Sequence, residues 1–448
     1  MNPAIKTRFD GYTDIENIRK RVTLHPDPVE GLEALQPRVA AEKFAEKIME
    51  IYLPNEFSLQ FIQEMINLAN LHSFKTFSSA AGYSEKVFTP ADTEVFPICL
   101  NGLAGVGKSQ TIVALLRALP PPIEFACDLF QGTIYLTSYW YASARGKASG
   151  KQLLLDFVIG GEHDGRGGNL KKLLVQSRQI ASRDGVSIVA LDETQHINTG
   201  QGASKVTDIL QTMAGIGPPM IYVSNFSLIH KLFRRNSEDK QRLLSEPRIM
   251  LPDTPESQDW HDYVKECMRV SGDRIKASTD EFAAELYRST FGIKRLAMFL
   301  LKAAYIECRT AGRKQIEVDD LFRAYRSSGY TSNARDVEEL QLQMINQGSK
   351  RARLDLVCPF DLPAEYKSNV VSFTRAERDK RVQARAFDSS TTPAERSVLN
   401  KILVPEEKAT ARKNRRSPVP KATDEDLVRA FHQYMDSQPG PQPPKKPR

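Results

Sequence analysis

Residues 102–109 combine side chains and spacing that suit phosphate binding. They read Gly-Leu-Ala-Gly-Val-Gly-Lys-Ser and match the pattern Gly-x-x-x-x-Gly-Lys-Ser/Thr, after an apolar run and before a helical one. Glycines let backbone amides approach phosphate oxygens closely, and the first turn of a helix adds N–H donors. Lys108 can reach the β- and γ-phosphates of a nucleotide, and Ser109 can hold Mg²⁺. We therefore expect ATP and Mg²⁺ to bind here, at Gly102, Gly105, Val106, Gly107, Lys108, Ser109 and Gln110.

A pair of acidic residues follows a second apolar run, residues 187–191. Asp192 is placed to contact Mg²⁺ directly or through water, and Glu193 is placed to polarise an attacking water. A strand followed by an ordinary acidic turn is the alternative. The phosphate-binding pattern upstream disfavours that alternative, so we expect Asp192 to be a metal ligand and Glu193 to be catalytic.

Two polar residues, Ser224 and Asn225, lie at the end of the apolar run that begins at residue 218. If this strand neighbours the one that ends at Asp192, either side chain can position the attacking water. A turn amide or hydroxyl that satisfies its own backbone is the competing interpretation. The sequence leaves the choice between Ser224 and Asn225 open.

Arginines are frequent in residues 233–251, where a helix is expected to run into a further strand. An arginine here can project into the nucleotide site of a neighbouring subunit and supply charge to the transition state. Arg242 and Arg248 are our candidates, and a surface salt bridge is the alternative for each. Arg295, in Gly-Ile-Lys-Arg at the start of a later helix, is expected to reach back to the γ-phosphate.

Short apolar runs alternate with helical stretches through residues 91–252, which predicts an α/β fold with a parallel sheet covered by helices on both faces. Ligands bind such sheets beyond the carboxyl ends of the strands, where the phosphate loop falls. The expected strands are residues 96–101, 132–137, 187–191 and 220–224. The other expected regions are an N-terminal helical accessory region (1–90), an all-helical lid (253–330) and a basic, partly disordered C-terminal tail (331–448).

Composition narrows the possible classes of protein. The chain has 448 residues, of which 41% are hydrophobic, and a net charge of +7, most of which falls in residues 331–448. The five cysteines form no Cys-x-x-Cys pair, which argues against a zinc site or a disulfide framework. The sequence has no apolar run long enough for a membrane span and no signal peptide at its start. We expect a cytoplasmic protein with no membrane partner.

Together these motifs resemble an AAA+ ATPase over roughly residues 90–330, and within that superfamily the TnsC/TniB regulators of DNA transposition. The resemblance rests on the order of the motifs, on Leu-Asp-Glu-Thr-Gln-His at 191–196, on Met-Ile-Tyr-Val-Ser-Asn-Phe at 220–226 and on the end of the lid at 312–321. It implies a homo-oligomer, a ring or filament, that forms on duplex DNA with ATP. A target-selection protein would signal to it, it would recruit transposase subunits, and ATP hydrolysis would reset it.

Other functions share parts of this pattern. Replication initiators of the ORC type and helicase loaders are one alternative, although the former normally append a winged helix and none is evident after residue 330. A binding scaffold stabilised by nucleotide, with little turnover, is another. The intact Asp192-Glu193 pair favours an enzyme that hydrolyses ATP.

The resemblance places contacts with the DNA backbone in residues 139–151, where Arg145, Lys147 and Lys151 lie among small residues. The glycine-rich residues 160–168 are a second possible contact or a linker. The tail contains a basic run at 401–421, an amphipathic stretch at 424–435 and a Pro/Lys-rich end at 439–448. We interpret the tail as a tether for transposase subunits, with a nucleic-acid-binding arm as the competing interpretation.

Overall fold

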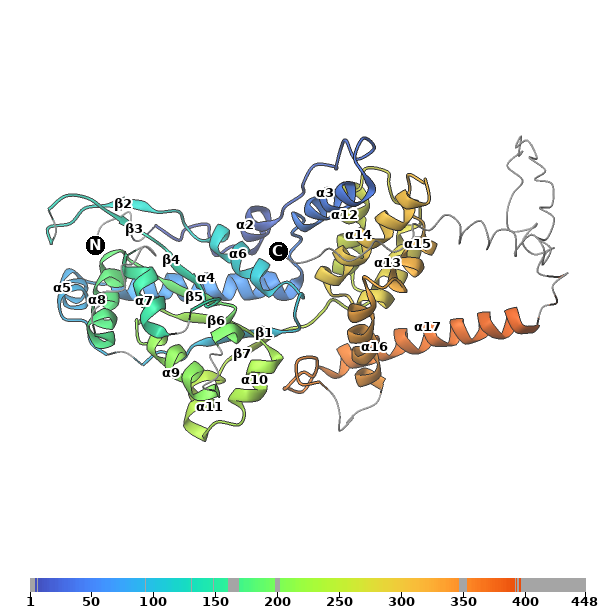
Figure 1. Ribbon diagram of the computed structural model, residues 1–448. Coiled ribbons are helices and arrows are strands. Elements are labelled where there is room, and N and C mark those ends of the chain that lie inside the picture. The colour runs from blue at the N-terminus through green and yellow to red at the C-terminus, as the bar shows by residue number, and fades with distance from the viewer. Residues whose placement is uncertain are drawn as a thin grey trace, which may run out of the picture. The chain divides into compact units, whose positions relative to one another are not determined.

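The computed structural model divides the chain into two units, Met1–Lys380 and Arg381–Arg448. The first unit holds the sheet and all the helices before α17 (Ala364–Ser390), which crosses the boundary between the units (Figure 1). The described residues are 5, 7–92, 94–129, 131–147, 149–159, 169–197, 202–345, 353–390, 392 and 395. The predicted contact at 160–168 and the tail segments 401–421, 424–435 and 439–448 lie outside them.

Five parallel strands form the central sheet, in the order β4-β5-β6-β1-β7. Parallel neighbours need long crossovers, and helices supply them here. The carboxyl ends of all five strands therefore meet at one edge, as the predicted α/β fold requires. The strands are β1 (Ile98–Gly102), β4 (Tyr139–Ser143), β5 (Ile188–Asp192), β6 (Met220–Asn225) and β7 (Pro247–Met250).

The prediction that residues 132–137 contribute a strand to this sheet was wrong. β3 (Ile134–Leu136) pairs antiparallel with β2 (Ile123–Phe125) in a separate two-stranded sheet. The strand that lies beside β5 at the edge of the sheet is β4, which follows β3 after two residues. The extended segment changes partners at Ser138, whose carbonyl accepts a hydrogen bond from the Ser187 amide at 2.9 Å. Apolar composition marks both halves of the segment as extended and does not say which sheet each half joins.

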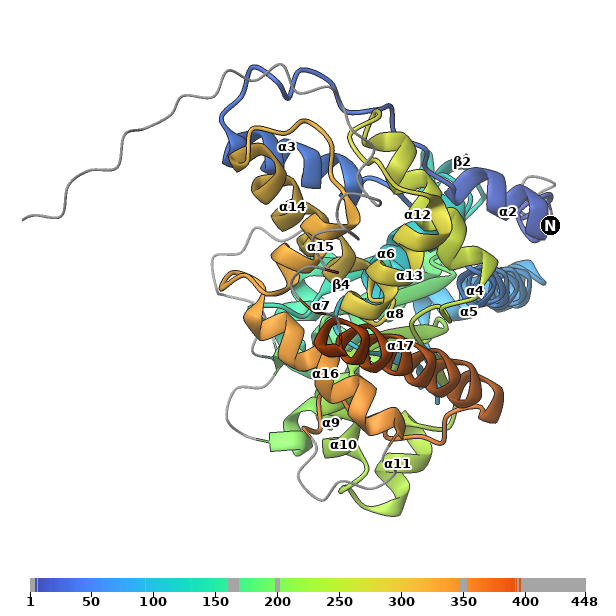
Figure 2. The ribbon, with the colours of Figure 1, turned by 90° about the vertical axis from the view of Figure 1, so that its right-hand side faces the viewer.

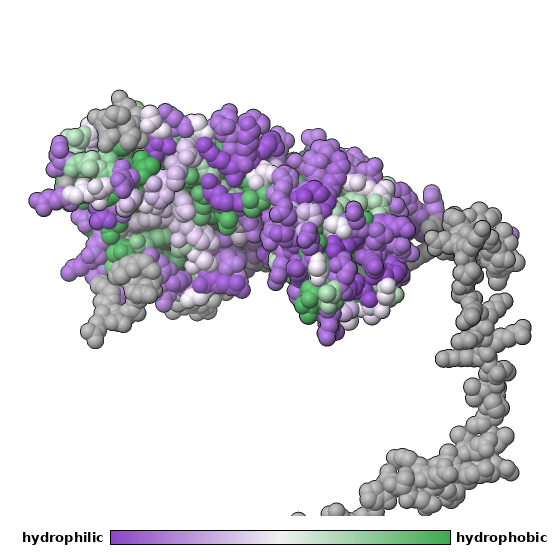
Figure 3. Space-filling view, turned by 90° about the horizontal axis from the view of Figure 1, so that it is seen from above, coloured by the Kyte–Doolittle hydropathy of each residue, from purple (hydrophilic) through white to green (hydrophobic). Residues whose placement is uncertain are grey.

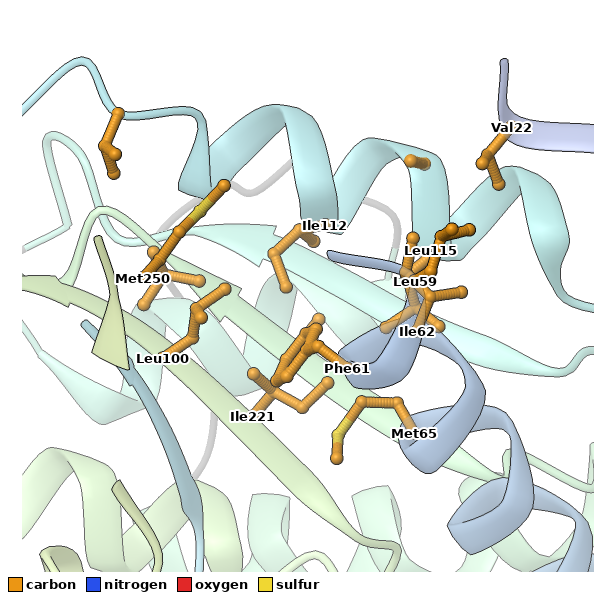
Figure 4. Packing of buried hydrophobic residues seen from close by; sticks show 14 of the residues in the cluster. Val22, Leu59, Phe61, Ile62, Met65, Leu100, Ile112, Leu115, Ile221 and Met250 are labelled. Atoms are coloured by element: carbon orange, nitrogen blue, oxygen red, sulfur yellow. The ribbon is translucent and has the colours of Figure 1, made fainter. Parts of the chain in front are cut away.

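Helices cover both faces of the sheet, because alternate strand residues point to opposite sides. One face packs against α4 (Glu56–Thr76) and α6 (Lys108–Ala118), as Figure 4 shows for Leu100, Ile221, Phe61 and Ile112. The other face, which includes Cys99 and Tyr222, packs against a different set of helices. That set is α7 (Gly150–Ile159), α8 (Leu170–Arg183), α9 (Gly202–Ala214), α10 (Phe226–Leu232) and α11 (Ser237–Leu243).

The long helix α4 illustrates how the sequence directs this packing. Asn55 caps it by accepting a hydrogen bond from the Ser58 amide at 2.9 Å. Leu59, Ile62 and Ile66 recur at helical spacing and are fully or almost fully buried against the sheet. Replacing one of these residues with alanine would destabilise the fold by about 2–5 kcal/mol.

The lid is helical, as predicted, and it includes a helix from the N-terminal region. α3 (Pro37–Met49) lies beside the lid helix α14 (Lys294–Thr310), where the rings of Phe44 and Tyr305 are 5.1 Å apart (Figure 2). α2 (Ile15–Val22) and α4 pack instead with the sheet domain. The N-terminal helices are therefore shared between the two subdomains. The lid helices are α12 (Gln258–Val270), α13 (Thr279–Thr290), α14 (Lys294–Thr310) and α15 (Val318–Tyr325); α5 (Ala80–Phe88) lies between α4 and β1 along the chain.

Residues 331–380, which composition assigned to the tail, belong to the first compact unit. α16 (Thr331–Ile345) and the start of α17 bury Val337, Leu340 and Val370 in the same cluster as residues of the phosphate loop. The sheet domain thus shares its core with a segment from beyond the lid.

The outer surface is mainly polar where it can be seen. Figure 3 shows one face on which hydrophilic residues predominate around scattered hydrophobic groups. Within the described parts of the chain, no helix is long and apolar enough to span a membrane.

Candidate nucleotide-binding site

The phosphate loop connects β1 to α6 and needs glycine at its bends. Gly105 and Gly107 have φ of +84° and +121°, which side chains rarely adopt. A Cβ on Gly102 would lie 2.3 Å from the carbonyl oxygen of Met250 on the neighbouring strand. No side chain caps α6, so the N–H groups of its first turn remain directed at the loop. Both the loop and the helix start therefore suit an anion.

Lys108 points into this loop. Its Nζ donates to the carbonyl oxygens of Gly102 at 2.9 Å and Leu103 at 2.7 Å, and to Oδ1 of Asn225 at 2.9 Å. Burial and the nearby charge of Arg295 lower the pKa of the Lys108 ammonium to about 7. A phosphate beside it would favour the charged form. The lysine is thus held where phosphate oxygens would arrive.

Ser109 and Asp192 meet where a metal ion would be needed. Asp192 ends β5 and is 4% exposed; burial raises the pKa of its carboxyl group, and a hydrogen bond with Ser109 opposes that shift. Hydroxyl and carboxylate oxygens are ligands that Mg²⁺ prefers. The described residues contain no group of three or more His, Cys, Asp and Glu side chains that could hold a metal. Such a pair fits an ion that takes its remaining ligands from phosphates and water.

Glu193 adopts an unusual backbone conformation beside this pair. Its φ is +54°, and its amide donates to Oδ1 of Asp192 at 2.6 Å. The carboxylate is about one-third exposed and lies 3.8 Å from Nε of Arg145. Arg145 follows β4, whose Ser143 is in register with Asp192. A residue predicted to bind DNA is therefore ion-paired with the predicted catalytic glutamate.

The structure separates the two candidates at the end of β6. Asn225 is in register with Gly102 on β1, and its side chain contacts Lys108. Ser224 is fully buried, with its hydroxyl 3.9 Å from Sγ of Cys99. Asn225 therefore belongs to the candidate site, whereas Ser224 lies within the sheet.

The lid reaches the phosphate loop directly. Near the start of α14, the Arg295 amide donates to the carbonyl oxygen of Gly105 at 3.2 Å. A Cβ on Gly105 would lie 2.8 Å from the Cβ of Arg295. The predicted lid arginine is thus brought to the site, while the other loop residues, Val106 and Gln110, take their places in the loop and the first turn of α6.

The two candidate arginine fingers are held by carboxylates of their own chain. Arg248, on β7, donates to Oε2 of Glu64 on α4 at 3.1 Å. Arg242, on α11, lies 3.1 Å from Glu238 and 3.5 Å from Glu94 and is 43% exposed. Arg242 is therefore the more accessible of the two.

The three predicted DNA-contacting residues differ in their surroundings. Arg145 is 73% exposed despite its ion pair with Glu193. Lys147 is one-third exposed and forms an ion pair with Asp156 at 2.8 Å. Lys151 lies in the first turn of α7 and is partly exposed.

The sequence analysis assigned no chemistry to the N-terminal region, yet this region adjoins the site. The Tyr52 hydroxyl lies 3.5 Å from Oγ1 of Thr111 on α6, and Asn55 donates to Oδ1 of Asp253 at 2.6 Å. Between these contacts the chain lines a pocket with α12. The pocket is lined by Arg19, Thr23, His25, Leu53, Pro54, Asp259, Asp262, Lys265, Glu266 and Arg269.

Comparisons with known proteins found no sequence relative. No protein-family model and no curated protein matches the chain. Among solved structures, the chain is similar to the ORC2 protein of Aeropyrum pernix, with 14% identity, 67% of this chain and 77% of that chain covered, and a TM-score of 0.41. It is also similar to the RuvB Holliday junction branch migration motor of Thermotoga maritima, with 13% identity, 71% of this chain and 87% of that chain covered, and a TM-score of 0.35. A third similar structure is Drosophila ORC bound to DNA, with 14% identity, 85% of this chain and 88% of that chain covered, and a TM-score of 0.38.

Because these TM-scores lie below 0.5, the fold class rests on the chain's own topology. The phosphate loop follows β1, which lies between β6 and β7, and the acidic pair follows β5 on the far side of β6. A helical lid after β7 returns to touch the loop. This is a parallel α/β fold with a phosphate loop after its first strand and the helical lid that the sequence predicted.

Proposed function

We propose that this chain is an AAA+ ATPase that binds ATP and Mg²⁺ and hydrolyses ATP, acting on duplex DNA as a regulator of transposition. One observation carries the enzymatic part. Lys108, Asn225 and the Ser109–Asp192 pair converge at the carboxyl edge of the sheet, with Arg295 arriving from the lid. Five side chains from four elements meet at one loop, as phosphoryl transfer requires.

Each residue of the site has a separate role in the proposed hydrolysis. Lys108 and the amides of the loop neutralise and orient the phosphates. Glu193 accepts a hydrogen bond from the attacking water and polarises it, and Asn225 orients that water from the adjacent strand. Mg²⁺, held by Ser109 and Asp192, would supply charge that stabilises the phosphate oxygens. Arg295 brings positive charge from the lid, so the lid would sense the terminal phosphate.

Hydrolysis in this proposal is completed by a second copy of the chain. Arg242 is exposed on α11, away from its own phosphate loop, and its carboxylate partners, Glu238 and Glu94, are themselves exposed. Exposed ion pairs of this kind contribute little stability and exchange readily. Arg242, or Arg248 after release from Glu64, would supply charge to the site of the neighbouring subunit.

We place the proposed DNA contact in the residues that directly follow β4. Arg145 and Lys151 expose cations there, and such contacts recognise the DNA backbone rather than its sequence. The ion pair between Arg145 and Glu193 supports a link between DNA and hydrolysis, because a DNA phosphate would compete with Glu193 for Arg145.

The transposition role rests on the TnsC/TniB resemblance of the motifs. After residue 330, the described residues form helices and connecting segments without a β-strand, which favours a transposition regulator over a replication initiator with a winged helix. We propose that the tail docks transposase subunits and that a target-selection protein delivers the signal.

Electron microscopy of the purified chain on duplex DNA tests the proposal. Rings or filaments should form with a non-hydrolysable ATP analogue and not with ADP. Lys108→Ala should abolish them. Assemblies that form equally with both nucleotides, or that persist in the variant, would contradict an ATP-dependent switch.

A further inference from the structure

Three buried polar atoms near the hinge between sheet and lid have no hydrogen-bond partner among the described residues. They are Oδ2 of Asp253 and the hydroxyls of Tyr287 and Tyr366, whose side chains are almost fully buried. Asp253 lies in the connection from β7 to the lid, Tyr287 on α13 and Tyr366 on α17. Buried polar groups are rarely left unpaired, because each such group costs free energy.

Asp253 and Tyr287 both lie beside Gly292, where an added Cβ would be 2.9 Å from the Asp253 carbonyl oxygen and 2.8 Å from the Tyr287 ring. Tyr366 lines the same cavity as Pro252, the residue before Asp253. Burial raises the pKa of both phenols, and the Asp253 carboxylate raises the pKa of each of them further. Both hydroxyls therefore remain protonated and can donate to an acceptor. The carboxylate of Asp253 is such an acceptor, because its Oδ2 accepts no hydrogen bond from the described residues and has only the ion pair with Lys294 at 3.3 Å.

Asp253 already joins two other parts of the chain. Its Oδ1 accepts from Asn55 at the start of α4, and its Oδ2 forms an ion pair with Lys294 at 3.3 Å. Lys294 precedes Arg295, whose amide bonds to the phosphate loop. If Arg295 moves toward a nucleotide, the adjacent Lys294 moves with it, and the ion pair between Lys294 and Asp253 changes.

Tyr366 belongs to a segment that we call the strap, residues 353–373. The Val357 carbonyl lies 2.9 Å from Nε2 of His230 on α10, and Phe373 stacks edge-on against Tyr287 at 5.2 Å. α10 starts directly after Asn225. The strap therefore contacts α10 of the sheet domain and α13 of the lid. Figure 2 shows α17 running beside α13.

A cavity of about 230 Å³ separates the strap from the phosphate loop. Leu103 and Phe226 line it from the sheet domain, Phe291 from the lid, and Leu356, Cys358 and Tyr366 from the strap. The cavity is open to solvent, and Gln343, Asp361 and Lys367 line it beside the apolar residues, so it is a space that side chains can enter. The cavity gives Tyr366 and the lid room to approach Asp253.

We propose that Asp253 is a hinge latch: when the lid closes on nucleotide, the hydroxyls of Tyr287 and Tyr366 donate to its carboxylate, and the strap is fastened to the closed lid. The latch rests on the proposed nucleotide site and extends it. Nucleotide then orders the strap, and the strap by the same coupling tightens nucleotide binding. The chain beyond residue 373, which leads to the tail, would report the nucleotide state.

Tyr366→Phe tests the latch because it removes one oxygen and keeps the ring. Without nucleotide, the variant should be as stable as the wild type or slightly more stable, since an unpaired buried hydroxyl is lost. With an ATP analogue and Mg²⁺, its affinity should fall about threefold to tenfold and its thermal shift should shrink. Tyr135→Phe is the matched control, because Tyr135 is exposed on β3 and should change neither quantity.

Unchanged affinity in Tyr366→Phe, with a thermal shift equal to that of the wild type, would overturn the latch while leaving the nucleotide site intact. A wild-type chain that shows no thermal shift with the analogue would overturn the nucleotide site and the latch with it. Hydrogen exchange adds an independent readout. Nucleotide should slow exchange in residues 353–363 of the wild type and not in Asp253→Asn, and protection that persists in this variant would contradict the latch.

Discussion

Two buried aspartates show two ways in which this chain builds a working centre. Asp192 ends β5 and meets Ser109, which belongs to a recognisable motif. Asp253 follows β7 and meets Asn55 and Lys294, which come from distant parts of the chain. The first centre performs chemistry and needs fixed residue types at fixed spacing. The second transmits motion and needs only that several elements arrive at one point.

This difference predicts that substitutions at the two centres affect different properties of the protein. Substitutions at the phosphate loop should remove binding or hydrolysis while the fold remains stable. Substitutions at the hinge should change stability and lid closure while the chemistry remains possible. The following experiments test this separation.

Glu193→Gln should have the largest effect on turnover. Loss of the group that polarises water should lower the rate of ATP hydrolysis about 10²- to 10⁴-fold. Binding of ATP should be retained, because Glu193 is not among the groups proposed to hold phosphates. Steady-state phosphate release measures the first effect and fluorescent-nucleotide titration the second. Glu85→Gln, exposed on α5, is the control; normal turnover in Glu193→Gln would remove Glu193 from its proposed role.

Lys108→Ala should weaken ATP binding about tenfold to 100-fold, the value of charged hydrogen bonds to phosphate. The same titration measures this loss. Lys172→Ala, exposed on α8, should bind normally. If Lys108→Ala bound ATP like the wild type, the loop would not be the phosphate site.

Gly292→Ala should affect stability at the hinge. Gly292 has a φ of +69°, and a Cβ there would lie 2.8 Å from the Tyr287 ring and 2.9 Å from the Asp253 carbonyl oxygen. Gly312 has a φ of +75° and nothing within 4 Å. Gly312→Ala should cost about 1 kcal/mol, from backbone strain alone, and Gly292→Ala about 2–4 kcal/mol. Equal costs in urea denaturation would show that the hinge tolerates the added atom.

Asn225→Ala and Ser224→Ala separate two neighbours on one strand. Asn225 contacts Lys108, so its loss should lower hydrolysis about tenfold. Ser224 lies inside the sheet, so its loss should leave hydrolysis unchanged and alter the free energy of unfolding by about 1 kcal/mol. The reverse result would assign the sensor role to Ser224.

The smallest effect is expected at the proposed DNA contact. Lys151→Ala should reduce the slope of log K against log salt by about 1 for any duplex sequence. Lys147→Ala should change it less, because Asp156 already neutralises Lys147. Fluorescence anisotropy at several salt concentrations measures both slopes. Unchanged slopes in both variants would move the contact elsewhere, for example to the tail.

The phosphate loop was predictable because its chemistry restricts residue type and spacing at once. The strands that end at Asp192 and Asn225 were found for a related reason, since buried parallel strands are apolar and polar residues follow them directly. The choice of Asn225 over Ser224 needed the strand register, which decides the face of each side chain. The error at residues 132–137 arose because an extended segment can pair with either sheet.

The hinge was beyond sequence reasoning for a different reason. Asp253, Tyr287 and Tyr366 are ordinary core or turn residues by composition, and their proximity depends on how α13 and α17 pack beside the connection that follows β7. Residues 331–380 carry mixed charge, so their buried side chains, such as Val337 and Val370, gave no distinctive pattern. Long-range packing of this kind leaves no local signal.

The placement of α3 in the lid has a mechanical consequence. α3 ends at Met49, and α4, which packs on the sheet, begins at Glu56, so residues 50–55 connect the two subdomains by a second stretch of backbone besides the one that follows β7. A fully extended tether of this length reaches at most about 25 Å. The middle of this segment is also held by a β-bridge between Tyr52 and Leu24, which follows α2. The lid is therefore connected to the sheet domain at two points, and the length of residues 50–55 limits how far the lid could move away from the phosphate loop.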